Sequence, residues 1–232
     1  MAEFVWPSRA IVSGQRGLGD GAVPPQDWAR LVFIGGVICR RCGRPETIDL
    51  GDDTVCAACE ARPPKWEHAR AALVYNEASR RPVLDLKRSG QRDGLKTLGR
   101  WMVQAGGPLV EAADCLVPVP LHYRRLVARG HNQSAWLAAE IGRQTATPVI
   151  QDAIRRTKPT PSQAGLNARA RRRNIRRSRA SRITGKRVVL IDDVLSSGAT
   201  VSACTAALKR AGAANVDVLV LARVVREIDV TM

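Results

Sequence analysis

The sequence predicts an α/β fold, in which a parallel sheet is flanked by helices, preceded by a small four-cysteine module. The clearest observation is the continuous apolar run at residues 188–191, which is typical of a strand buried on both faces of a parallel sheet. Residues 115–120 and 215–224 form two similar runs, and we expect the last of them to close the sheet. Apolar residues with helical spacing follow two of these strands, at 135–143 and 200–208.

Length and composition agree with this prediction. A chain of 232 residues that is 45% hydrophobic is long enough for one mid-sized α/β domain and a small module. No segment approaches the roughly 20 consecutive apolar residues of a membrane helix. The early apolar run at residues 31–38 is too short, and begins too late, for a signal peptide. We therefore expect a cytoplasmic protein with no membrane span and no disulfides. The sequence does not predict its oligomeric state.

The charge is unevenly distributed along the chain. The formal net charge is +16, and 29 of the 37 lysines and arginines lie after residue 68. A strongly basic region favours a polyanionic ligand, which could be a pyrophosphate or a nucleic acid.

Two Cys-x-x-Cys pairs, separated by thirteen residues, lie before the predicted sheet. This spacing favours one structural Zn²⁺ bound by four thiolates, because a segment with so little core of its own needs a metal to fold. A redox dithiol, an iron–sulfur centre and reduced cysteines without metal are the alternatives. The predicted zinc ligands are Cys39, Cys42, Cys56 and Cys59. Cys115 and Cys204 lie in apolar surroundings and are expected to be small buried side chains.

These features divide the chain into three parts. Residues 1–26 are rich in glycine and proline without periodicity, which predicts a flexible extension. Residues 27–64 contain the cysteine pairs and form the predicted zinc-ribbon-like module. Residues 65–232 form the α/β domain, which begins with a strand at 69–75 and has a helix at 95–104.

The stretch that follows the apolar run at 188–191 has the residues of a phosphosugar site. Asp192 and Asp193 stand where the strand is expected to end, and a loop with two serines and a glycine leads into a helix at Thr200. The free N–H groups of a helix N-terminus bind phosphate, and adjacent carboxylates accept hydrogen bonds from a sugar diol or face a hydrated cation. This combination indicates a ribose 5-phosphate. The alternative is an ordinary turn that the two acids happen to cap.

A second strand, at 115–120, precedes a loop with three arginines and no acid. We expect Ser134 to cap the helix that follows this loop. A basic loop before a helix N-terminus favours a second anion, such as pyrophosphate. The alternative is a solvated basic loop.

Residues 157–182 are the least regular part of the chain, with eight arginines between Arg169 and Arg182 and no acid. They could form a surface loop, a mobile lid that brings arginines to a phosphorylated substrate, or a patch that binds the backbone of a nucleic acid.

Several motifs are shared with one known family. They are the paired cysteines, residues 86–90, 117–121 and 129–133, Arg156-Thr157 with Gln163 and Leu166, Arg169 or Arg173 with Asn174, and the strand with its two acids. From Cys39 to Val224 the chain resembles ComF-type proteins, the competence-associated homologues of phosphoribosyltransferases, and more distantly the amidotransferase-type enzymes. Family members usually have phenylalanine where this chain has His131.

The resemblance implies a type I phosphoribosyltransferase fold that binds phosphoribosyl pyrophosphate with Mg²⁺. It implies that the two acids bind the ribose hydroxyls, residues 196–200 the 5-phosphate and residues 129–133 the pyrophosphate, with 156–174 as a flexible catalytic loop. The implied catalytic residues are Arg129, Arg156, Asp192 and Asp193. The implied ligand-binding residues are Arg129, Gly130, Asn132, Gln133, Asp192, Asp193, Ser196, Ser197, Gly198, Ala199 and Thr200.

The implied reaction is displacement of pyrophosphate at the anomeric carbon, for which the sequence does not identify the acceptor. The resemblance also implies an association with DNA uptake. The competing hypothesis is therefore a non-catalytic protein that binds single-stranded DNA through the arginine-rich segment, in contact with the competence helicase or other import machinery.

Overall fold

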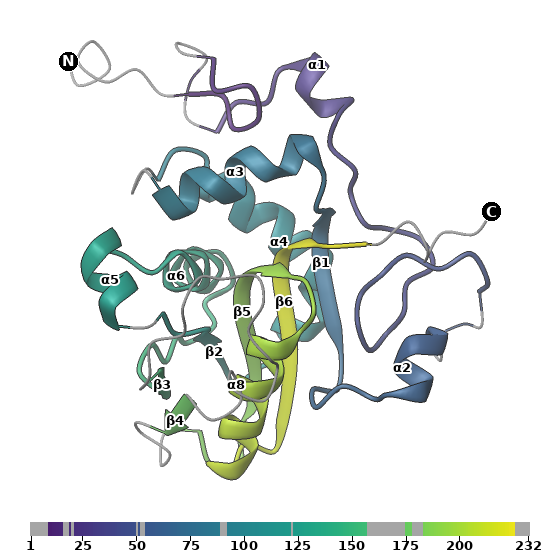
Figure 1. Cartoon of the computed structure of the whole chain (residues 1–232), viewed down its shortest axis with the longest axis vertical. Helices are drawn as coiled ribbons and strands as arrows, with labels where there is room; N and C mark the ends of the chain where they lie inside the picture. Colours follow the sequence, from purple (N-terminus) through teal and green to yellow (C-terminus); the bar gives the residue numbers. More distant parts are fainter. Residues whose placement is uncertain are drawn as a thin grey trace.

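The computed structural model of the chain describes residues 9–15, 19, 21–49, 51, 54–88, 92–121, 123–156, 175–177 and 183–225. They form a parallel sheet flanked by helices, with a loop-rich four-cysteine module beside one edge of the sheet (Figure 1). The elements in chain order are α1 Pro25–Trp28, α2 Ala57–Ala61, β1 Ala69–Val74, α3 Glu77–Arg88, α4 Leu95–Glu111, β2 Cys115–Pro118, α5 Tyr123–Arg129, α6 Gln133–Thr145, β3 Ile154–Arg156, β4 Ile175–Arg177, β5 Arg187–Leu195, α8 Ala199–Arg210 and β6 Asn215–Arg223. The predicted α/β fold class is confirmed.

The main sheet has the strand order β1-β6-β5-β2, and all its neighbouring strands are parallel. The expectation that the last strand closes the sheet is wrong, because β6 lies between β1 and β5. The burial of β6 from Val216 to Ala222 explains this position, since a strand that is apolar on both faces is suited to the interior of a parallel sheet. The short strands β3 and β4 form a separate antiparallel pair.

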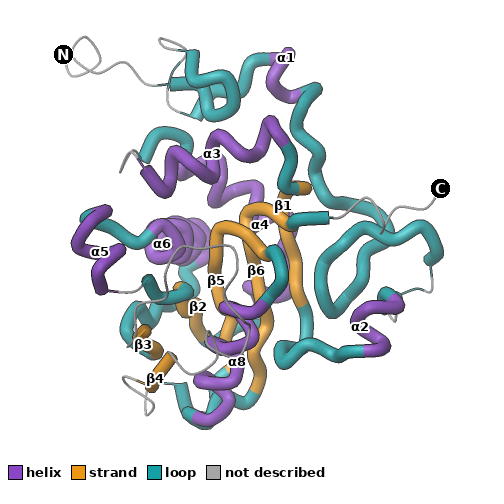
Figure 2. The backbone as a smooth tube through the Cα atoms, viewed as in Figure 1, coloured by secondary structure: helices purple, strands orange, loops and turns teal. Residues whose placement is uncertain are grey.

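The apolar run of β5 contributes side chains to the cores on both faces of the sheet. Val188 and Leu190 belong to the core on the side of α8, whereas Val189 and Ile191 belong to the core on the side of α4 and α6. Successive side chains of a strand point to opposite faces, so an unbroken apolar run requires cover on both sides. The tube view shows these helices on either side of the strands (Figure 2).

Helix α4 continues to Glu111, beyond the predicted end at residue 104. The chain passes Pro108 because the helix bends at Gly106, whose backbone is not helical (φ −115°, ψ 15°). A Cβ atom at Gly106 would lie 2.6 Å from a methyl group of Leu219, so glycine lets the helix approach β6 closely. The preceding helix, α3, starts at Glu77.

The described part of the predicted flexible extension is packed against the domain. Ile11 and Val12 are buried in the core that includes α3 and α4. The Ser13 amide donates a hydrogen bond to the buried carboxylate of Asp27, at 2.9 Å. Composition alone missed this packing because three consecutive apolar residues, 10–12, are too few to give a periodic signal.

Residues 32–34 lie along the exposed edge of β1. Phe33 forms an antiparallel bridge with Leu73, the Ile34 amide donates to the Ala72 carbonyl at 2.9 Å, and the Val74 amide donates to the Val32 carbonyl at 2.8 Å. This segment covers an edge that would otherwise be open to pairing with another chain. Within the described residues, every helix is too short or too polar to span a lipid bilayer.

Candidate functional site

Asp192 and Asp193 lie within β5, and not beyond its end as the sequence suggested. The strand continues because Val194 and Leu195 still pair with Ala222 and Arg223 of β6. Both carboxylates are buried, with 8% and 5% of their residue surfaces exposed. They border a cavity of about 490 Å³, which is lined from β5, α3, α6 and the start of α8.

Asp193 is held by two donors from different helices. Lys87 of α3 places its Nζ atom 2.8 Å from Asp193 Oδ2, and the Gln133 side-chain amide of α6 donates to the same oxygen at 3.2 Å. The lysine side chain is 26% exposed, so this pair is more shielded than a typical surface ion pair. Lys87 falls within residues 86–90, one of the motifs shared with ComF-type proteins, but sequence reasoning did not assign it to the site.

Asp192 accepts its hydrogen bonds from two uncharged donors. Ser134 Oγ donates to Asp192 Oδ1 at 2.9 Å, and the Asp193 amide donates to the same atom at 3.0 Å. Burial, together with the neighbouring charge of Asp193, raises the pKa of Asp192 to about 7. Near neutral pH, the protonation of this carboxyl is therefore sensitive to whatever ligand or cation enters the cavity.

The predicted helix cap is wrong by two residues. Asn132, and not Ser134, is the N-cap of α6, and its side-chain oxygen accepts a hydrogen bond from the Ser134 amide at 3.1 Å. The Asn132 side-chain amide also donates to the Val119 carbonyl at 3.1 Å. Because Asn132 provides the cap, the Ser134 hydroxyl is available to bind Asp192.

The loop of residues 196–200 joins β5 to α8. Gly198 adopts a left-handed conformation (φ 68°), and it precedes a helix with no acid in its first turn. Ser196 and Ser197 are exposed. Free N–H groups at the start of this twelve-residue helix, with hydroxyls beside them, are suited to an anion.

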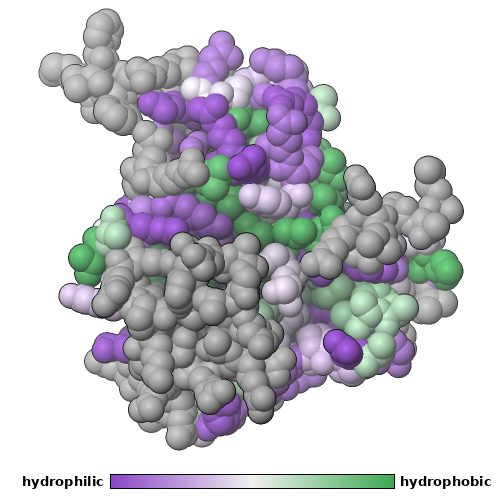
Figure 3. All heavy atoms as spheres, viewed as in Figure 1, coloured by the Kyte–Doolittle hydropathy of each residue, from purple (hydrophilic) through white to green (hydrophobic). Residues whose placement is uncertain are grey.

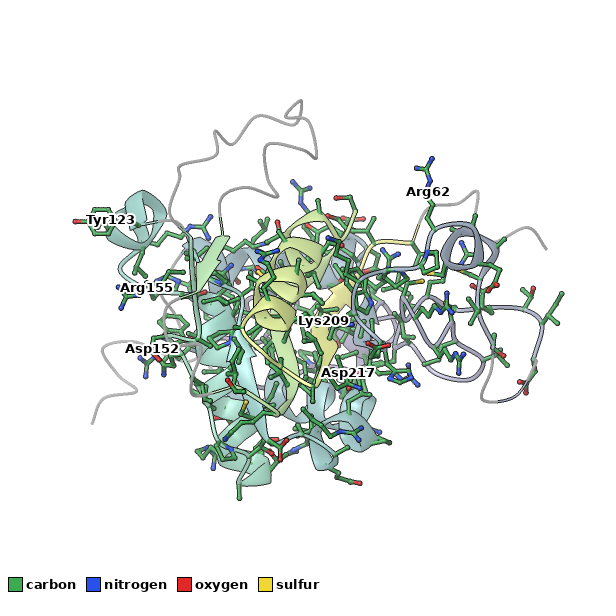
Figure 4. The ribbon with its side chains drawn as sticks, turned by 90° about the horizontal axis from the view of Figure 1, so that it is seen from below. Arg62, Tyr123, Asp152, Arg155, Lys209 and Asp217 are labelled. Carbon is green, nitrogen blue, oxygen red and sulfur yellow. The ribbon has the colours of Figure 1, made fainter. Side chains whose placement is uncertain are left out.

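The predicted pyrophosphate loop contains a helix, α5, where the sequence suggested a basic loop. Tyr123, Leu126 and Val127 on α5 are 71%, 41% and 64% exposed. Figure 3 shows hydrophobic atoms on the outer face of α5, and Figure 4 shows Tyr123 pointing away from the molecule. Arg129 ends this helix, borders the cavity and donates to the Gln133 side chain at 3.5 Å.

Only some of the predicted ligand-binding residues line the cavity beside the two acids. Those that line the cavity are Arg129, Gln133, Asp192, Asp193, Ser196 and Thr200. Ser197 and Gly198 line a second cavity that the cysteine module also borders, whereas the described residues Gly130, Asn132 and Ala199 line neither of the two. Arg156 ends β3, but its side chain and the predicted catalytic loop at 157–174 lie outside the described residues.

His131 connects the loop before α6 to helix α3. Its Nε2 atom lies 2.8 Å from the Leu86 carbonyl, and its Nδ1 atom lies 2.8 Å from the Arg129 carbonyl. The ring stacks on Trp136, with centroids 4.1 Å apart. Histidine thus places two hydrogen-bonding ring nitrogens at a position where the resemblance to ComF-type proteins implied phenylalanine.

The four cysteines of the predicted module form one cluster. The sulfur atoms of Cys39, Cys42, Cys56 and Cys59 all lie within 4.8 Å of one another, and the four residues are buried. The amides of Cys56 and Cys59 donate to Cys39 Sγ at 3.3 Å and Cys56 Sγ at 3.4 Å. The hydrogen bond to Cys39 raises the pKa of Cys42 to about 11, because neighbouring thiols resist joint ionisation without a cation. This arrangement is compatible with one Zn²⁺.

The likeness to known proteins is clear at the level of family. Residues 108–228 match the phosphoribosyl transferase domain family. The chain is 30% identical to the DNA utilization protein YhgH of Escherichia coli O157:H7 over 204 residues, which cover 84% of this chain and 88% of that protein. It is 27% identical to competence protein F of Haemophilus influenzae over 178 residues, covering 72% and 78% of the two chains. A solved allosteric regulatory enzyme of purine biosynthesis aligns with a TM-score of 0.40 and 20% identity, over 60% of this chain and 30% of that one.

Proposed function

The chain belongs to the ComF family of phosphoribosyltransferase-like proteins, and on that premise we propose that it binds phosphoribosyl pyrophosphate, with Mg²⁺, in the cavity beside Asp192 and Asp193. The observation that carries the proposal is the joint arrangement of two buried acids and a helix N-terminus around one cavity. The acids accept hydrogen bonds from the ribose hydroxyls, and the 196–200 loop binds the 5-phosphate.

The residues around the cavity fit a magnesium complex of a pyrophosphate. Mg²⁺ is usually bound by one or two carboxylates together with phosphate oxygens and water. Asp192 and Asp193 supply the carboxylates, and Lys87 and Arg129 supply positive charge beside them. The metal would neutralise negative charge on the pyrophosphate.

We propose transfer of the phosphoribosyl group as the reaction. The acceptor's electron pair forms a bond to the anomeric carbon, the bond from that carbon to pyrophosphate oxygen breaks, and pyrophosphate leaves with the bonding pair. A proton carried by the acceptor passes to solvent. Arg129 and Lys87 stabilise charge in the cavity, and the buried acids orient the ribose.

Calorimetry with the full chain, phosphoribosyl pyrophosphate and MgCl₂ tests the binding step. We expect the wild-type protein to bind and Asp193→Asn to lose roughly tenfold or more in affinity, because it loses charge-assisted hydrogen bonds. Glu111→Gln, an exposed acid at the end of α4, is the matched control and should leave affinity unchanged. Absence of binding by the wild-type protein, or equal affinity of Asp193→Asn, contradicts the proposal. A screen for pyrophosphate release across nucleobases and amines then identifies the acceptor.

A second candidate function is a role in DNA import without catalysis. The names of the relatives, DNA utilization protein and competence protein F, and the net charge of +16 favour it. In this proposal the arginines between Arg169 and Arg182 bind the backbone of single-stranded DNA, and import machinery such as a competence helicase is the partner. Binding should weaken steeply with salt, be lost when these arginines are replaced and be unaffected by Asp193→Asn.

A further inference from the structure

Arg223, the last residue of β6, joins the cysteine module to the predicted phosphate loop. Its Nε atom donates to the Cys42 carbonyl at 3.2 Å. Its Nη1 atom donates to the carbonyls of Leu195 and Ser196, both at 3.1 Å, and to that of Val224 at 2.6 Å. One guanidinium therefore bridges the first cysteine pair and the start of the loop that leads into α8.

Trp66 makes a second connection between the same two regions. Its indole Nε1 donates to the Arg41 carbonyl, between the first two cysteines, at 2.6 Å. The other end of its ring lies so close to Gly198 that a Cβ atom there would be 2.8 Å from Trp66 Cη2. The side chain is buried, so the contact is part of the packed interior.

These two side chains border a cavity of about 270 Å³ between the cysteine cluster and the loop. Cys42, Cys56 and Cys59 line one part of it, and residues 196–198 line another. A displacement of the first cysteine pair can therefore change the position of the loop through two sets of contacts, those of Arg223 and those of Trp66.

The hydrogen bonds of Arg223 also determine which way the loop's peptide groups face. In a planar trans peptide the carbonyl and the following N–H point in opposite directions. Because the carbonyls of Leu195 and Ser196 point at Arg223, the amides of Ser196 and Ser197 point away from it. The Leu195 carbonyl also accepts from the Val224 amide, directly after the neighbouring strand β6, at 3.0 Å, so Arg223 shares control of the Ser196 amide. At the Ser196 carbonyl, Arg223 orients the peptide whose Ser197 amide faces the predicted phosphate site.

We propose that Arg223 and Trp66 are positioning residues, through which the metal-bound cysteine module sets the conformation of the phosphate loop. The inference rests on the proposed binding of phosphoribosyl pyrophosphate and adds a coupling between that ligand and Zn²⁺. Neither residue lines the larger cavity in front of the acids, so both act through the loop and not by touching the ribose.

The first test compares Arg223→Lys and Trp66→Phe with wild type, using the full zinc-loaded chain. Lysine keeps the charge but loses the planar fork that reaches several carbonyls, and phenylalanine keeps a ring but loses the indole donor. We expect Arg223→Lys to weaken binding of phosphoribosyl pyrophosphate by roughly tenfold or more, with a smaller loss for Trp66→Phe. The control is Arg143→Ala, an exposed arginine on α6 that should bind as wild type does.

The second test uses the reciprocity of coupled binding, which does not depend on catalytic turnover. Zinc affinity is measured by competition with a coloured chelator, with and without phosphoribosyl pyrophosphate. We expect the ligand to increase zinc affinity in wild type and to have a weaker effect in Arg223→Lys.

The outcomes separate the two proposals. If wild type fails to bind phosphoribosyl pyrophosphate, the proposed function is wrong. If wild type binds it, but ligand affinity is unchanged in both variants and zinc affinity is the same with and without ligand, the coupling is overturned and the binding function stands. A variant that fails to fold leaves the wild-type zinc competition as the deciding measurement.

Discussion

The Ser134 hydroxyl donates a hydrogen bond to Asp192 Oδ1 at 2.9 Å and thereby links the first turn of α6 to β5. Both residues are buried, and burial is the main cause that raises the pKa of Asp192 to about 7. The hydrogen bond acts in the opposite direction, since it stabilises the carboxylate. This balance leads to two predictions.

The first prediction concerns the pH dependence of folding. The pKa of Asp192 is higher in the folded chain than the usual aspartate value of 3.8, so the folded state binds the proton more tightly. Its stabilising contribution is therefore complete below pH 3.8 and is lost as the pH rises through about 7. Urea unfolding of wild type and Asp192→Asn between pH 5.5 and 8.5 measures this contribution. We expect the stability of wild type to fall relative to the variant as the pH rises, and parallel curves contradict the assignment.

The second prediction concerns Ser134→Ala. Removing the hydroxyl leaves a buried carboxylate with one donor fewer, which costs about 1–3 kcal/mol of unfolding free energy. The cost should be larger at pH 8 than at pH 6, because the lost hydrogen bond stabilised the ionised form. Ser202→Ala, on α8 and half-buried, is a matched control with a small expected effect. Equal losses at the two pH values would mean that the serine does not act on Asp192.

The third prediction concerns the Lys87–Asp193 pair, whose charged atoms lie 2.8 Å apart. Lys87→Met leaves a buried carboxylate without its cation and should cost about 1–3 kcal/mol of stability. Adding Asp193→Asn should recover part of that loss, as measured in a double-mutant cycle by urea unfolding. Lys209→Met is the control, because it breaks an exposed ion pair with Glu67 whose charged atoms lie 2.7 Å apart, close to the 2.8 Å of the Lys87–Asp193 pair. It should lower the unfolding free energy by no more than about 1 kcal/mol. Similar costs for the two lysines would contradict a special role for Lys87.

The fourth prediction concerns the cysteine cluster. The purified chain should contain one Zn²⁺, and Cys56→Ser should lose it, because serine is a much weaker ligand for zinc than a thiolate. Cys115→Ala is the control, since this buried cysteine lies in β2 outside the cluster. Elemental analysis measures the zinc content, and a thiol-reactive dye, used with and without a chelator, measures how many cysteines the metal protects. Retention of zinc by Cys56→Ser, or its loss in Cys115→Ala, is the contradictory result.

Sequence reasoning succeeded where a local pattern has one physical cause. An unbroken run such as Val188–Ile191 favours a strand buried on two faces, and the two Cys-x-x-Cys pairs meet in one buried cluster as their spacing predicted. It failed where the outcome depends on contacts between distant segments. Nothing local to Lys87 indicates that its amine meets Asp193, and nothing local to Ser134 shows that Asn132 replaces it as the helix cap.

The position of the strand ends shows the same limit. Two charged residues after an apolar run suggested that β5 stops at Ile191, since charges are rarely buried in a sheet. The strand continues to Leu195 because donors from α3 and α6 satisfy both acids. Those donors lie 58 or more residues earlier in the chain, beyond the reach of a local pattern.

The last prediction concerns His131, which offers its two ring nitrogens to the carbonyls of Leu86 and Arg129. Leu86 lies in the last turn of α3, where carbonyls lack partners within the helix, and the next residue is Lys87. His131→Phe keeps an aromatic ring against Trp136 but removes the ring nitrogens and the hydrogen bonding that they provide to these carbonyls. We expect it to lower the unfolding free energy by about 1–3 kcal/mol and to weaken binding of phosphoribosyl pyrophosphate, because the lysine is less firmly held. His131→Gln, which keeps a side-chain donor without the ring, separates hydrogen bonding from stacking. If His131→Phe has the same stability and ligand affinity as wild type, the ring acts through packing alone.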